Sequence, residues 1–197
     1  ILSRNNQLFK SMSKNYVDQY SFKNIKKNNG RNNVRVIGIG GSILGSQAIY
    51  HFLKDKIKRK FFFINNLKSS KKLSNKEKIT NLVISKSGNT LETIANVNLL
   101  VKERNNIFLT ENKKSYLSEL ALKLKAEIIN HNNFIGGRYS VLSEVGMLPA
   151  ELMGLDANKF KQLNNLIKNK NFVNSLISNV SSTLLFIKNK KFNSIIL

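Results

Sequence analysis

Apolar and polar residues follow two different periods along the middle of the chain. Short runs rich in branched and aromatic residues predict five β-strands, at 34–40, 61–65, 81–85, 106–110 and 126–130. Between them, apolar residues recur at helical spacing and predict helices at 46–53, 91–101 and 115–124. Because strands that alternate with helices form parallel sheets covered on both faces, this pattern predicts an α/β fold with about five parallel strands.

Beyond residue 136 the pattern becomes mainly helical. One helix is expected over 141–155, with an interruption near Pro149, because proline removes a hydrogen bond of the helix. Further helices are expected over 158–189, and 194–197 has the composition of a strand that is just beginning. The strand–helix alternation therefore ends before the last quarter of the chain.

These patterns divide the chain into three parts. We expect a peripheral segment of helix and loop over 1–33 and the domain with the parallel sheet over 34–155. The remainder, 156–197, is expected to hold helices and the first strand of a second, incomplete domain. Since the chain begins with Ile1 rather than methionine and stops within an apolar run, we expect it to be a fragment of a longer protein.

The formal net charge of +22 is a feature of proteins that bind nucleic acids. However, 27 lysines outnumber six arginines and accompany 30 asparagines, a mixture that an AT-rich genome encodes by default. Proteins that read duplex DNA depend on arginine, because its planar fork matches guanine edges and phosphates. We therefore expect a solvated basic surface and no nucleic-acid partner. Binding through charge stays open as an alternative, and its loss at physiological salt would count against it.

The chain has no cysteine and no apolar run of membrane-spanning length. We therefore expect a cytoplasmic protein without disulfides, without thiolate metal sites and without a membrane partner. Neither His51 nor His131 has a partner at metal-ligand spacing, and we expect no metal and no cofactor.

A glycine-rich segment, GIGGSILG at 38–45, joins the first predicted strand to a helix. It differs from a dinucleotide-binding loop because Ile43 stands where that loop has its third glycine. It also lacks the Gly-Lys-Ser/Thr end of a nucleotide phosphate loop. Gly40 and Gly41 instead allow the backbone to approach a ligand, with the amide and hydroxyl of Ser42 directed at it. Packing between strand and helix is the alternative role for these glycines.

The segment SKSGNTLET, at 85–93, places four hydroxyl groups, a lysine and a glycine between a strand and a helix. Hydroxyl and amide groups donate hydrogen bonds to anions, and a helix N-terminus adds about half a positive charge. A plain helix cap by Asn89 or Thr90 is the alternative. Because capping alone does not require so many hydroxyls, the segment favours a phosphate site.

A third segment, GGRYSVLS at 136–143, holds one of the chain's few arginines. The two glycines before Arg138 allow a backbone geometry that turns the guanidinium inward. Arginine is charged at any working pH and offers planar donors to an oxyanion. An arginine on the surface after a glycine turn is the alternative.

Together the three segments resemble motifs of the phosphoglucose isomerase family, in the family's order and approximate spacing. GIGGSILGS is similar to the family's glycine–serine loop, SKSGNTLET to its sugar-phosphate loop, and GGRYSVLSEVGMLPAEL to a signature segment. The likeness covers most of 34–155. It implies a three-layer sugar isomerase (SIS) domain, the start of a second one, and the interconversion of glucose 6-phosphate and fructose 6-phosphate.

The resemblance also assigns the phosphate site. Ser85, Ser87 and Thr90, with the backbone amide of Lys86, would hold the substrate phosphate. The partner implied is a small sugar phosphate, and the complete protein is expected to be a homodimer.

At the sugar end, the resemblance implies that Gly41 and Ser42 line the site. Arg138, with Gly137 shaping its approach, would stabilise the enediolate that forms as a proton moves between the first and second sugar carbons. The family's glutamate base, ring-opening histidine and late lysine would lie beyond Leu197, so we expect the fragment alone to be inactive. A non-catalytic sugar-phosphate regulator built on the same domain is the alternative, although 1–33 shows no helix-turn-helix pattern.

Overall fold

The computed structural model describes most of the chain: Tyr16, Tyr20, Ile25 and residues 32–67, 78–102, 105–163, 165 and 168–189. Nearly all of the peripheral segment expected over 1–33, and the whole strand expected at 194–197, lie outside these residues. The three-part division of the chain therefore stays a prediction.

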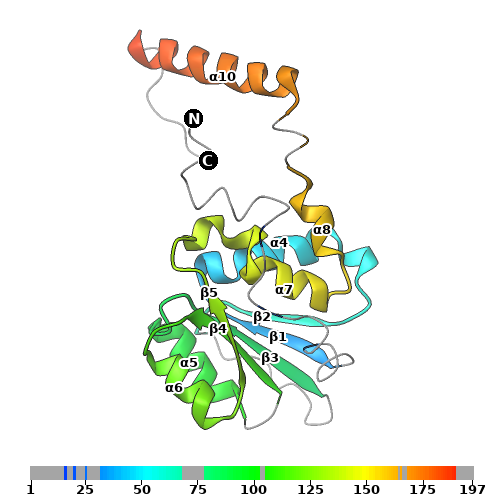
Figure 1. The fold of residues 1–197 in the computed structure, drawn as a ribbon, viewed down its shortest axis with the longest axis vertical. Helices are drawn as coiled ribbons and strands as arrows, with labels where there is room; N and C mark the ends of the chain where they lie inside the picture. The colour runs from blue at the N-terminus through cyan, green and yellow to red at the C-terminus, as the bar shows by residue number, and fades with distance from the viewer. Residues whose placement is uncertain are drawn as a thin grey trace.

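In the part of the chain that the structure describes, five strands form one parallel sheet. They are β1 (Asn33–Ile37), β2 (Phe61–Ile64), β3 (Ile79–Ile84), β4 (Asn106–Glu111) and β5 (Glu127–His131), in the order β2-β1-β3-β4-β5 (Figure 1). Every neighbouring pair is parallel, with Val36 opposite Leu82 and Ile84 opposite Leu109. The predicted number and direction of strands are confirmed.

Helices cover both faces of the sheet, which gives three layers (Figure 1). The helices α5 (Leu91–Leu100) and α6 (Tyr116–Lys123) lie on one face, and α4 (Leu44–Phe52) and α7 (Glu144–Leu152) lie on the other. Alternate strand residues serve the two faces, because side chains of a strand point to opposite sides. In β3, for example, Val83 packs with α5 and α6, and its neighbours pack with α4 and α7.

The segment before α7 differs from the prediction. Residues Gly137–Leu142 form a 3-10 helix, η3, and α7 begins only at Glu144 and continues through Pro149 without interruption. A proline inside a helix costs about 3 kcal/mol or more. Every residue of α7 except Glu151 is buried, so packing against the core outweighs that cost.

The chain then forms α8 (Ala157–Phe160), η4 (Lys161–Leu163) and the long helix α10 (Lys170–Lys188). Helices were expected here, and α10 lies apart from the three-layer domain in Figure 1. From Leu176 onward its apolar side chains, including Leu184, are about half exposed or more. No helix among the described residues is both long enough and apolar enough to cross a membrane.

Candidate functional site

The strands β1 and β3 are neighbours at the centre of the sheet, and the chain leaves them toward opposite faces. The helix α4 follows β1 on one face, and α5 follows β3 on the other (Figure 1). In an open parallel sheet, such a reversal opens a crevice outside the carboxyl ends of the strands, and ligands bind there. The glycine-rich loop after β1 and the hydroxyl-rich loop after β3 therefore border the position where a ligand is expected.

The third segment reaches the same region through a contact between two backbones. The 3-10 helix η1 (Gly40–Ser42) packs against η3, and a Cβ atom at Gly41 would lie only 2.2 Å from the carbonyl oxygen of Gly137. The hydroxyl of Ser140 lies 2.7 Å from that oxygen and 3.3 Å from the carbonyl oxygen of Gly41. A residue with a side chain at Gly41 would push the two loops apart.

The hydroxyl groups of the loop after β3 point toward one another rather than into a helix cap. Thr90 is the N-cap residue of α5, but its side chain makes no capping hydrogen bond. Its Oγ1 lies 3.2 Å from Ser85 Oγ and 3.4 Å from Ser87 Oγ. The geometry of Thr90 therefore differs from that of a plain cap, and the three hydroxyls form one cluster beside the helix N-terminus.

Neighbouring elements hold this loop in shape. Gly88 has φ of +67°, and a Cβ there would lie 2.0 Å from Ser115 Oγ, so the position requires glycine. The amide of Leu117 donates to the carbonyl of Gly88 at 3.0 Å, and the amide of Tyr116 donates to Asn89 Oδ1 at 2.9 Å. Asn89, a candidate cap for α5, thus satisfies the first amide of α6 instead.

A hollow of about 280 Å³ lies next to the hydroxyl cluster. Its lining combines hydroxyl groups with charged groups: Ser42, Lys86, Ser87, Thr90, Glu111 and Lys113. Ser85 is buried behind this surface. The structure thus brings Ser42 from the glycine-rich loop together with the hydroxyl-rich loop. Gly41, Gly137 and Arg138 are not part of the lining.

Two of the lining residues, Glu111 and Lys113, were not predicted from the sequence. Lys113 Nζ lies 2.6 Å from one carboxylate oxygen of Glu111, and Lys86 Nζ lies 3.5 Å from the other. Burial alone would raise the pKa of Glu111, but the hydrogen bonds and charges of the two lysines outweigh burial and lower this pKa. Their position directly after a predicted strand was the signal that could have found them.

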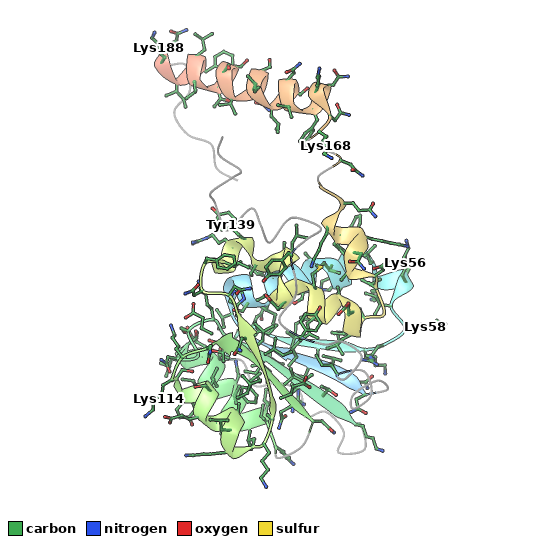
Figure 2. All side chains as sticks on the ribbon, viewed as in Figure 1. Lys56, Lys58, Lys114, Tyr139, Lys168 and Lys188 are labelled. Carbon is green, nitrogen blue, oxygen red and sulfur yellow. The ribbon has the colours of Figure 1, made fainter. Side chains whose placement is uncertain are left out.

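Arg138 lies near the start of η3 with its side chain exposed. Sequence reasoning expected the guanidinium to turn inward, and the structure instead leaves it facing solvent, like its neighbour Tyr139 (Figure 2). The backbone of Gly137, the residue before Arg138, nevertheless lies against Gly41. The catalytic role of Arg138 stays a prediction.

A buried polar cluster joins Tyr16, from the first part of the chain, to the first residue of α7. Glu144, the first residue of α7, is fully buried, and it accepts a hydrogen bond from the hydroxyl of Tyr16 at 2.7 Å. The side chain of His131, also buried, lies 3.7 Å from the second carboxylate oxygen. Among the described residues, no group of three or more His, Cys, Asp or Glu side chains could hold a metal ion.

Comparison with known proteins supports the same family as the motifs. The family model described as phosphoglucose isomerase matches residues 4–192. The glucose-6-phosphate isomerase of Methanocaldococcus jannaschii is 37% identical over 145 residues, which cover 68% of this chain and 36% of the relative. That of Acholeplasma laidlawii is 40% identical over 144 residues, covering 63% and 34%. The chain thus spans about a third of the length of these curated relatives.

A solved structure has the same arrangement of sheet and helices. The crystal structure of a glucose-6-phosphate isomerase from Chlamydia trachomatis D/UW-3/Cx superimposes with a TM-score of 0.57 and 25% identity. The superposition covers 71% of this chain and 29% of that one. The family model extends over nearly the whole chain, and the solved relative shares its fold. This chain therefore belongs to the phosphoglucose isomerase family.

Proposed function

We propose that this chain provides the sugar-phosphate site of an aldose–ketose isomerase, which as a complete protein interconverts glucose 6-phosphate and fructose 6-phosphate. The observation that carries the proposal is the hydroxyl cluster of Ser85, Ser87 and Thr90 beside a hollow that Lys86 also lines. The cluster stands at the N-terminus of α5, where backbone amides and the helix dipole favour an anion. A phosphate monoester fits these donors by charge and by hydrogen bonding.

The sugar would extend from the phosphate toward the glycine-rich loop. Ser42 lines the same hollow, and Gly41 brings the backbone of Gly137 against this loop. Arg138 is then one residue away from that contact. During isomerisation a proton moves between the first and second sugar carbons through a negatively charged enediolate, which a fixed cation stabilises. We assign this role to Arg138, and we assign the base to the remainder of the complete protein.

The lysines support a small anionic ligand more than a nucleic acid. Lys56 and Lys58 lie together at one edge of the molecule, and Lys114, Lys168 and Lys188 lie at other places on it (Figure 2). A nucleic-acid surface would instead gather such charges on one face. We further propose that the complete protein is a cytoplasmic homodimer without a nucleic-acid or membrane partner.

Replacing Thr90 by valine should weaken the binding of fructose 6-phosphate to this chain about tenfold or more. The two side chains have similar shapes, and the change removes one hydrogen bond to a charged phosphate, worth about 1.5–3 kcal/mol. Titration calorimetry with fructose 6-phosphate, and with fructose as a ligand without phosphate, measures the effect. Thr183→Val in α10 is the matched control and should bind like the unchanged chain. Equal affinities for Thr90→Val and Thr183→Val would exclude this site.

A further inference from the structure

Three charged side chains meet on one wall of the hollow. Glu111 stands between Lys86 and Lys113, with a lysine nitrogen near each carboxylate oxygen, at 3.5 and 2.6 Å. All three residues line the hollow together with Ser87 and Thr90. A carboxylate in this position would repel a phosphate group unless nearby cations outweighed its charge.

Lys86 alone does not outweigh the charge of Glu111. One lysine against one ionised glutamate leaves this wall neutral, and a second lysine makes it positive. The ammonium group of Lys86 also donates to the carbonyl of Asn133 at 2.7 Å, so it is shared with the loop after β5. The positive charge needed next to a phosphate therefore depends on Lys113.

The backbone fixes Lys113 in this place. Its amide donates to the carbonyl of Glu111 at 2.8 Å, which forms a tight turn after β4. The amide of Glu111 in turn donates to the carbonyl of Lys86 at 3.1 Å. The hydroxyl of Thr110 also donates to the carbonyl of Lys86, at 3.3 Å, and joins the end of β4 to the phosphate loop. Lys113 is thus held beside the hollow by main-chain geometry and not only by its ion pair.

We propose that Lys113 is a further phosphate-binding residue, which offsets Glu111 and keeps the hollow positive for a phosphate dianion. The inference rests on the proposed function, because it concerns the same site. The side chain of Lys113 is half exposed, at 51%, so its ammonium group can turn toward an incoming phosphate without losing a buried contact. Lys113 already pairs with a carboxylate beside the hollow, and the role that we assign to this lysine is in binding.

Lys113→Ala should weaken the binding of fructose 6-phosphate about fivefold to tenfold in low-salt buffer, because the dianion loses one nearby positive charge. Titration calorimetry on this chain measures the affinity. Lys114→Ala is the matched control, since it removes the same charge one residue away. Lys114 is 89% exposed, pairs with Glu119 and points into solvent at the outer edge of the domain (Figure 2). Its loss should change the affinity less than about twofold.

The double variant Lys113→Ala with Glu111→Gln tests the charge balance directly. Removing the carboxylate as well restores one net positive charge, so the affinity should return to within about threefold of the unchanged chain. Equal affinities for Lys113→Ala and Lys114→Ala, or no recovery in the double variant, would overturn the role of Lys113 alone. An unchanged affinity in Thr90→Val, or no binding by the unchanged chain, would instead overturn the phosphate site itself and the inference with it.

Discussion

Replacing Arg138 by alanine should lower the kcat of the complete isomerase by roughly 10²–10³, a cost of about 3–4 kcal/mol in the barrier. The guanidinium is expected to meet negative charge that exists only on the enediolate, so the loss should appear in kcat more than in KM. Steady-state turnover of fructose 6-phosphate measures both constants.

Because Arg138 is exposed, an effect of its replacement on turnover can be separated from an effect on folding. Its side chain faces solvent, so Arg138→Ala should change the free energy of unfolding by less than about 0.5 kcal/mol. Thermal unfolding of the variant provides the control for folding. Arg138→Lys should recover part of the lost rate, since lysine keeps the charge but lacks the planar fork. Full activity in Arg138→Ala would show that another group stabilises the enediolate.

Replacing Glu144 by alanine should lower the free energy of unfolding of this chain by about 3–5 kcal/mol, because breaking a buried pair leaves its partners unsatisfied. Glu144 is fully buried and accepts hydrogen bonds from Tyr16 and, at 3.5 Å, from Asn132. The buried side chain of His131 would also lose its acidic neighbour. For a chain of this size the change corresponds to a fall in Tm of about 10 °C.

Glu119→Ala is the matched control for Glu144→Ala. Glu119 lies in the first turn of α6, is half exposed and pairs with Lys114 at the surface. Surface ion pairs contribute about 0–1 kcal/mol, so this variant should unfold within a few degrees of the unchanged chain. Similar Tm values for the two variants would mean that the cluster around Glu144 does not stabilise the fold.

Periodicity was sufficient to predict the sheet, because its central strands β3 and β4 are buried on both faces and read as short apolar runs. The ends of the strands and helices were predicted less accurately than their number and order. The first strand stops at Ile37 and not at residue 40, since Gly38 packs against the carbonyl of Ile84 and the chain then turns into η1. The uninterrupted helix through Pro149 depends on burial by distant elements, which local sequence does not encode.

In the candidate site, too, some features could be predicted from local sequence and others could not. The segments around Ser42 and Ser87 were predicted from residue types at strand ends, and the structure places both side chains on one hollow. Glu111 and Lys113 were missed because a glutamate and a lysine two residues apart look like ordinary surface charges in a lysine-rich chain. The outward position of Arg138 also depends on backbone packing between η1 and η3, which no spacing rule predicts.

We expect the loop between β3 and α5 to hold the phosphate of a sugar phosphate. Heteronuclear NMR of this chain during titration with fructose 6-phosphate tests this, with fructose at the same concentrations as the comparison. We predict saturable shifts, largest for the amides from Ser85 to Thr90, that fructose does not cause. Shifts confined to other elements, or equal shifts with fructose, would contradict the claim.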